Sequence, residues 1–285
     1  MLQASIKGLL AKEYVGAEAP PMVFTGVRPP AYRQDHLAEI ADARAMQREA
    51  PSESGFLTEH ACVLLPHQTA VRDWDADVAN VYRPEVASIT RERLLPGRRV
   101  EIFQGTKVVT RGGGKRIYGE GVHCDGPLTP DSYATNLGAL TTPQAELNWR
   151  RNFARDEVAG FMLINFWRPI NMREPVRDYP LALCDPLSVD PDDVFSARIP
   201  RLTSEGRVSR HLALRFNPGQ SWRYYPAMTT NEVLVFKQSE FWKESPDAGP
   251  RANVFHTAFR DPTAPPEAEP RRSCEHRVGV MILRD

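Results

Sequence analysis

The segment Gly119-Glu-Gly-Val-His-Cys-Asp125, followed at once by Gly126-Pro127, carries the strongest local signal in the chain. A short run that ends at a Gly-Pro pair is typical of a strand followed by a turn. Residues two apart on a strand share a face, so His123 and Asp125 point the same way and Cys124 points away as a packed thiol. An ordinary exposed His-Asp pair beside a turn has the same pattern, so the pair alone identifies no site.

A third candidate residue, His256, lies far downstream in the alternating run Asn253-Val-Phe-His-Thr-Ala-Phe259. Two imidazoles and one carboxylate on one side of a metal leave three coordination positions open, which is the ligand set of non-haem Fe(II) oxygenases. The alternative is that His256 is a core histidine with a hydrogen-bonded ring. We predict that His123, Asp125 and His256 are metal ligands.

Composition limits the class of protein. The 285 residues suffice for one large β-rich domain or two modest ones, and Lys plus Arg balances Asp plus Glu at 36 each. No long basic run occurs, so we expect no nucleic-acid or anionic-membrane partner. No apolar stretch approaches the roughly 18 residues of a membrane span, and the N-terminus lacks the apolar core of a signal peptide. The four cysteines have no C-x-x-C spacing, which favours reduced thiols in the cytoplasm.

The distribution of apolar residues predicts the fold. Residues 37–47 have helical composition, and residues 77–95 show helical spacing of apolar residues with an aspartate to cap the start. After Arg99 the pattern changes to short alternating or apolar runs at residues 100–104, 107–110, 161–167, 181–184, 211–216, 222–225, 232–237, 254–259 and 274–283. We therefore predict a mainly β (α+β) protein, a cupin-like double-stranded β-helix or jelly roll with flanking helices. Residues 1–98 would form a flanking segment with helices that packs on the core, and residues 99–285 the jelly-roll catalytic core, the two together forming one structural domain.

An arginine-rich segment follows the proline-rich stretch at residues 261–270. On a strand, four polar side chains of this segment share one face: Arg271, Ser273, Glu275 and Arg277. An arginine that makes a two-point contact with a carboxylate, helped by a serine hydroxyl, suits the distal carboxylate of an oxo-acid. The alternative is a set of solvated charges ahead of a final core strand.

Several linked motifs then resemble one family. They are Ile164-Asn-Phe-Trp-Arg-Pro-Ile170, Pro175-Val-Arg-Asp-Tyr-Pro-Leu-Ala-Leu-Cys-Asp185 with Ser188-Val-Asp190, Trp222-Arg-Tyr-Tyr with Met228, Asn231-Glu-Val-Leu-Val-Phe-Lys237, and His256-Thr-Ala-Phe-Arg-Asp-Pro262 leading into Pro270-Arg-Arg-Ser273. Together with weaker upstream similarity they cover roughly residues 40–283, and they resemble the CmcJ-like and AsaB-like hydroxylase/desaturases. That family is similar to Fe(II)/2-oxoglutarate oxygenases.

The resemblance implies an activity and the residues that carry it. His123, Asp125 and His256 match iron ligands, and Arg271 with Ser273 resembles the pair that binds 2-oxoglutarate; Arg277 is the competing anchor. The implied cofactors are Fe(II) and 2-oxoglutarate, with O2 as oxidant. The implied reaction is hydroxylation, desaturation or oxidative cyclisation of a small metabolite in natural-product biosynthesis. Because Asp125 fills the third protein position, halogenation is not expected.

One segment departs from the family pattern. The acidic-serine pair that usually follows the Phe-Lys strand is replaced by Gln238-Ser-Glu-Phe-Trp242. We expect this region to shape the substrate pocket, so the substrate of a relative does not transfer to this chain. The expected partner is a small molecule, with a carboxylate as one option, and no oligomeric state is predicted.

Further candidates for substrate binding are Asn165, Trp167, Arg168 and Arg111. Core packing is the alternative for the first three, and a loop at Gly112-Gly-Gly114 is the alternative setting for Arg111. Two other classes of function stay open. One is a cupin-type metal enzyme that does not use 2-oxoglutarate, and the other is a non-catalytic binding protein.

Overall fold

The computed structural model describes residues 2–21, 33–105, 108–112, 118–199, 208–245 and 252–284. Within these ranges the strands are β1 (Leu2–Leu10), β2 (Arg33–Asp42), β3 (Cys62–Pro66), β4 (Val100–Gln104), β5 (Val109–Arg111), β6 (Val158–Pro169), β7 (Leu181–Cys184), β8 (Val194–Ile199), β9 (Ser209–Leu214), β10 (Trp222–Tyr224), β11 (Glu232–Trp242), β12 (His256–Ala258) and β13 (Ser273–Leu283). The helices are α1 (Ala43–Arg48), α2 (Glu53–His60), α3 (Arg83–Ile89), α4 (Pro130–Leu140) and α5 (Pro143–Ala154), with π-helical turns at Val78–Tyr82 and Thr90–Leu94 and 3-10 turns at Pro186–Ser188 and Pro191–Asp193.

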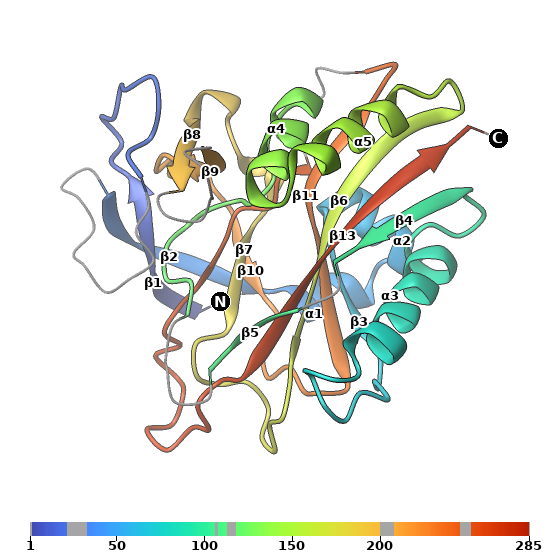
Figure 1. The fold of residues 1–285 in the computed structure, drawn as a ribbon. Coiled ribbons are helices and arrows are strands. Elements are labelled where there is room, and N and C mark those ends of the chain that lie inside the picture. Colours follow the sequence, from blue (N-terminus) through green and yellow to red (C-terminus); the bar gives the residue numbers. More distant parts are fainter. Residues whose placement is uncertain are drawn as a thin grey trace.

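Two main sheets form the body of the described chain (Figure 1). The first sheet runs in the order β1-β2-β10-β7-β12, and the second runs in the order β3-β11-β6-β13-β4, with β5 also paired to β13. Strands β8 and β9 pair with each other in a small third sheet. The ring of Phe236 on β11 lies 5.0 Å from the ring of His256 on β12, so the two main sheets face each other at this point.

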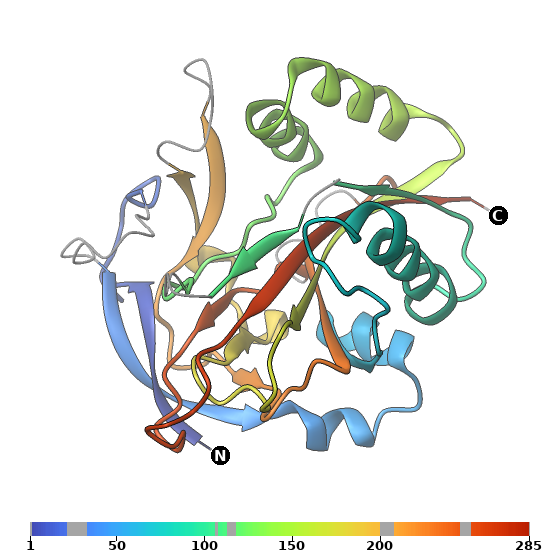
Figure 2. The same cartoon turned by 60° about the horizontal axis from the view of Figure 1, so that its bottom comes forward.

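Alternation along β6 and β13 separates the two faces of the second sheet. Phe166 and Val278 belong to the face covered by helices, where they are buried in one cluster with Val86 of α3. In both views α3 lies alongside β13 and β4 (Figures 1 and 2). Asn165 and Arg277 are opposite each other in the β6–β13 register, so both point to the other face, toward the first sheet. The second sheet therefore turns polar residues inward.

Each of the short runs predicted from residue 100 onward as strands of the core coincides with or overlaps a strand, and the bounds of β4 and β7 agree at both ends. The short strand expected at residues 119–125 is instead a segment with isolated bridges at His123 and Cys124. Residue 107 of the expected run 107–110 lies outside the described residues. The helix expected at 77–95 is confirmed at 78–94, with the two π-helical turns flanking α3. Pro84 lies in the first turn of α3, directly after the π-helical turn Val78–Tyr82.

The helix expected at residues 37–47 is wrong over most of its length. Residues up to Asp42 form β2, which pairs antiparallel with β1 and parallel with β10, and only α1 beyond it is helical. Pairing on both sides outweighs the local preference for helix. Asp42 then caps α1, since its side chain accepts a hydrogen bond from the Arg44 N–H.

Helices α4 and α5 were not expected from the sequence. Thr129 and Thr142 cap their first turns, and a proline follows each cap. Helix α4 contacts β9 and α5 contacts β6, and the two helices lie side by side near one end of β6 (Figure 1).

The first 98 residues supply strands as well as helices. Strands β1 and β2 join the first sheet beside β10, and β3 joins the second sheet beside β11. The proposed boundary at residue 98 stays a prediction. In the part of the chain that the structure describes, no helix has the length and hydrophobicity that a membrane crossing requires.

Candidate metal centre

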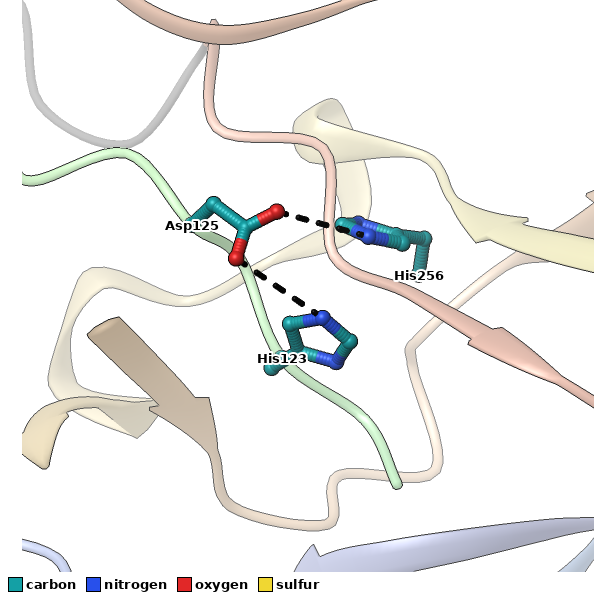
Figure 3. A group of neighbouring side chains, drawn as sticks. All are labelled: His123, Asp125 and His256. Atoms are coloured by element: carbon teal, nitrogen blue, oxygen red, sulfur yellow. Dashed lines mark ion pairs between the residues drawn. The ribbon is translucent and has the colours of Figure 1, made fainter. Parts of the chain in front are cut away.

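Main-chain pairing brings the three candidate ligands together. The His123 N–H donates to the carbonyl of His256 at 3.2 Å, and the His256 N–H donates back to His123 at 2.9 Å. Asp125 follows two residues later, and all three side chains converge (Figure 3). Their nitrogen and oxygen ligand atoms lie within 4.8 Å of one another. This geometry is the one predicted from the sequence spacing.

Each imidazole is fixed in one tautomer by a backbone carbonyl. Nδ1 of His123 lies 2.7 Å from the Gly121 oxygen, and Nδ1 of His256 lies 3.1 Å from the Val254 oxygen. A carbonyl oxygen only accepts, so the proton is on Nδ1 and the lone pair is on Nε2. Both Nε2 atoms lie 3.9 Å from the carboxylate of Asp125, one at each oxygen. Histidines that bind metals are oriented in this way.

The charges of the site favour the forms that bind a cation. Burial, reinforced by the neighbouring His123, lowers the pKa of His256 to about 3, so the ring is neutral near pH 7. Burial acts to raise the pKa of Asp125, but Arg277 and the two histidines outweigh it and hold that pKa below its usual range. A neutral imidazole and an ionised carboxylate are the states that a metal needs.

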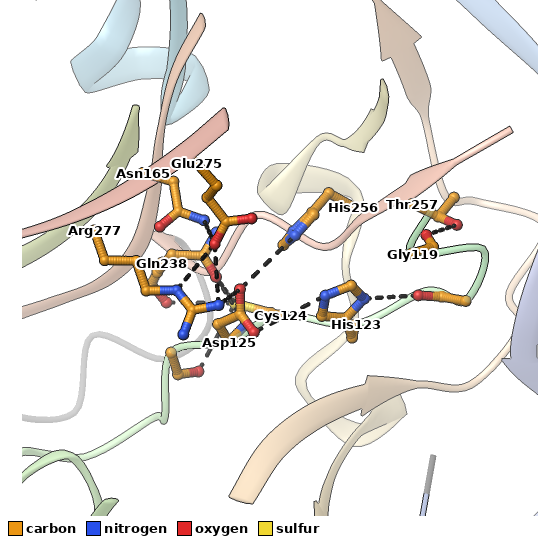
Figure 4. Close-up of polar contacts among 12 residues, drawn as sticks. Gly119, His123, Cys124, Asp125, Asn165, Gln238, His256, Thr257, Glu275 and Arg277 are labelled. Atoms are coloured by element: carbon orange, nitrogen blue, oxygen red, sulfur yellow. Dashed lines mark hydrogen bonds and ion pairs between the residues drawn. The ribbon is translucent and has the colours of Figure 1, made fainter. Parts of the chain in front are cut away.

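Arg277 reaches the same carboxylate from β13. Its Nη2 lies 2.9 Å from Asp125 Oδ2 and 3.0 Å from Glu275 Oε1, and Asn165 donates to Glu275 at 3.4 Å (Figure 4). The side chain of Arg277 is 42% exposed. Two carboxylates therefore compensate the positive charge of Arg277, and Asn165 belongs to the same network beside the candidate ligands.

Arg271 lies two residues before β13 begins and has a different environment. The side chain is 2% exposed, and its guanidinium lies 4.3 Å from the ring centre of Tyr118 and 5.5 Å from that of Trp167. Nη1 donates to the Tyr179 carbonyl. Burial lowers the pKa of Arg271 to about 10, which leaves it charged at neutral pH. Among the described residues no carboxylate pairs with this guanidinium, and neither its Nε nor the buried hydroxyl of Ser273 has a hydrogen-bond partner.

The remaining substrate candidates separate into two groups. Trp167 faces Arg271, and Arg111 of β5 lies opposite Ser273 in the β5–β13 register. Arg168 is buried on the other face of β6, where Nη1 lies 3.1 Å from His67 Nδ1 and Nη2 donates to the carbonyl of the same residue at 3.0 Å. These contacts favour the alternative of core packing for Arg168, and its role in substrate binding stays a prediction.

Two buried residues at the site were not found from the sequence. Gln238 accepts a hydrogen bond from the Asp125 N–H at 2.8 Å, and Asn253 donates to the Gly126 carbonyl at 3.1 Å. The only feature of the sequence that pointed to either residue was the departure from the family pattern at Gln238. Cys124 is fully buried, and burial raises the pKa of its thiol to about 12, which confirms the packed thiol.

A protein family described as the oxidoreductase/YMDC permease-like domain matches residues 14–281. The chain belongs to this family. Among curated proteins it is similar to the Fe(II)/2-oxoglutarate-dependent dioxygenase nvfI of Aspergillus novofumigatus, at 30% identity over 42% of this chain and 41% of that protein. It is also similar to the hydroxylase/desaturase CTB9 of Cercospora beticola, at 32% identity over 50% of this chain and 41% of that one. The alpha-ketoglutarate-dependent dioxygenase phiK of a fungal species matches at 26% identity over 79% of both chains.

These relatives confirm the resemblance to hydroxylase/desaturases. The chain spans about two fifths of the length of the first two relatives. Among solved structures, the iron and alpha-ketoglutarate-dependent endoperoxidase NvfI aligns with 99% of this chain and 98% of its own, at a TM-score of 0.70 and 22% identity. This likeness shows the fold, and it confirms the predicted double-stranded β-helix with flanking helices.

Proposed function

We propose that the chain is a non-haem Fe(II)- and 2-oxoglutarate-dependent oxygenase that acts on a small metabolite. The observation that carries this proposal is the convergence of His123, Asp125 and His256, with both Nε2 lone pairs turned toward one carboxylate. When bound, Fe(II) with 2-oxoglutarate and O2 supplies the oxidation of a C–H bond, with release of succinate and CO2. The chain's own part is to hold the ion, orient both organic molecules and limit access of water.

The triad fits iron by the chemistry of its donors. The two imidazoles are held by carbonyl contacts and main-chain pairing, so their orientation exists before an ion arrives. Three protein donors leave room for other ligands on a six-coordinate ion. A closed four-ligand site, which is typical of structural zinc, has no counterpart among the described residues here.

We infer that Arg271 and Ser273 receive the distal carboxylate of 2-oxoglutarate. A buried cation without a counter-ion is costly, and a carboxylate would complete both the unpaired Nε and the unpaired hydroxyl. The rings of Tyr118 and Trp167 hold the plane of the guanidinium. Arg277 is the weaker candidate, because Asp125 and Glu275 already compensate its charge.

For the substrate, a metabolite with an anionic group is supported by Arg111, a further cation on the strand next to Ser273. The curated relatives act, by their descriptions, as dioxygenases and hydroxylase/desaturases. We therefore propose hydroxylation, desaturation or oxidative cyclisation as the reaction. A cytoplasmic location is supported by the cysteines, which are all buried free thiols.

Succinate release tests the proposal. The purified protein with Fe(II), 2-oxoglutarate, ascorbate and O2 should form succinate slowly without substrate and faster with the right metabolite. His256→Ala should abolish this, while His36→Ala, which alters a histidine stacked on Phe216 at 3.8 Å, should not. Metal-dependent turnover without succinate would indicate a cupin-type enzyme instead. No metal retention at all would indicate a binding protein.

A further inference from the structure

The backbone of Asp125 is held by a side chain and not by a strand. The residues before it pair through the main chain, His123 with His256 and Cys124 with Leu212. That pairing ends at Asp125, whose N–H donates instead to Oε1 of Gln238 at 2.8 Å. The candidate carboxylate ligand is thus the first residue beyond the sheet, and one carboxamide fixes its main chain.

A bulge in β11 places this carboxamide. Lys237 pairs with Ile164 and Ser239 pairs with Leu163, so Gln238 is an extra residue between two consecutive partners. A bulge re-aims the side chain of its extra residue, and Gln238 is fully buried beside the candidate ligands (Figure 4). Gln238 lies two residues after Phe236 of the inner face, and the bulge also places Ser239 opposite Leu163, with its hydroxyl on the Pro127 carbonyl at 2.8 Å.

The contacts around Gln238 lock the carboxamide and the Asp125 segment together. Asn253 Nδ2 donates to the Gln238 carbonyl at 2.5 Å and to the Gly126 carbonyl at 3.1 Å. The Cys124 thiol lies 3.3 Å from Gln238 Oε1. Gly126 has to be glycine here, because a Cβ would come within 2.1 Å of the Gln238 carbonyl oxygen. Cys124, Gln238 and Asn253 are buried, and Asp125 is partly buried.

The orientation of the amide is set by Asp125. Oε1 has two donors, the Asp125 N–H and the Cys124 thiol, whereas Nε2 is buried and has no partner among the residues that the structure describes. Turning the amide over would place an NH2 group against the Asp125 N–H and lose the contact. Nε2 is thus left unpaired in the orientation that lets Oε1 accept from the Asp125 N–H, although an unpaired buried donor is unfavourable.

We propose that Gln238 is a positioning residue for metal binding, which acts through the main chain of Asp125. This inference rests on the proposed metal-binding function. Gln238 does not touch the ion; it holds Asp125 so that the carboxylate meets both Nε2 atoms. Partners that orient metal ligands typically contribute about 10- to 100-fold to metal affinity.

The test is equilibrium binding of Mn(II), followed by electron paramagnetic resonance of the free ion. Gln238→Leu removes the acceptor at similar volume and should weaken Mn(II) binding by about 10- to 100-fold. Gln238→Asn, whose shorter side chain falls short of the Asp125 N–H, should also weaken binding. Gln238→Glu keeps an acceptor oxygen and should bind Mn(II) more tightly than the Leu variant. The Asn and Glu variants decide the question if the Leu variant does not fold.

Gln104→Leu is the matched control. Gln104 donates to the Arg83 carbonyl at 3.0 Å and lies 2.9 Å from His276 Nε2, on the helix-covered side of the same sheet. It should lose stability and keep Mn(II) affinity. Wild-type protein that binds no Mn(II) would overturn the proposed function. Wild-type binding with unchanged affinity in the folded Gln238 variants would overturn the positioning role alone.

Discussion

At the scale of single residues, the partners of Arg271 and Arg277 decide their roles. Arg271 and Arg277 are the same residue type at positions that one continuous strand would place on one face, so the sequence left both as anchors for 2-oxoglutarate. The structure gives Arg277 two carboxylates and gives Arg271 two aromatic rings and a carbonyl. Such partners come from segments far apart in the chain, and local pattern carries no information on them.

We predict that Arg271→Gln weakens 2-oxoglutarate binding strongly. A hydrogen bond to a charged group contributes about 1.5–3 kcal/mol, so the loss should be about 10- to 100-fold in affinity. Arg277→Gln should change 2-oxoglutarate affinity much less, because its guanidinium is already paired. The measurement is calorimetric titration of 2-oxoglutarate into the anaerobic Mn(II) protein. The reverse order of the two variants would assign the anchor to Arg277.

At the scale of elements, the alternation of side chains with a period of two residues predicted strands correctly where the strand is long and has two different faces. It placed β6 and β13 and the shared face of Ser273, Glu275 and Arg277 correctly. It failed where pairing decides the outcome, since β2 has helical composition and is a strand between β1 and β10. The bulge at Gln238 likewise depends on the pairing of β11 with β6, and no residue type in the sequence predicts it.

The helix-covered face of the second sheet yields a stability prediction. Phe166 is fully buried under α3, whereas Phe103 on β4 is 41% exposed. Phe166→Ala should lower the free energy of unfolding by about 3–5 kcal/mol, because a large buried ring leaves a cavity. Phe103→Ala should cost under about 1 kcal/mol. Urea denaturation measures the free energy of unfolding of both variants. Equal losses would mean that the hydrophobic core does not lie on the helix-covered face.

At the scale of the whole molecule, two facing sheets bring together residues that the sequence separates widely. Asp125 and His256 meet because the segment before Asp125 pairs with the segment at β12. The sequence predicted the ligand types, the jelly-roll class and the convergence of the triad. It did not predict that β1, β2 and β3 complete both sheets, because their partners β10 and β11 lie far downstream.

The most direct measurement is the visible absorption spectrum of the anaerobic protein with Fe(II) and 2-oxoglutarate. If His123, Asp125 and His256 hold one iron ion with room for the oxo-acid, wild-type protein should show the weak charge-transfer band of that complex. His256→Ala should not show it, and His36→Ala should. A wild-type spectrum without the band, under conditions where an established enzyme of this class gives it, would contradict the account.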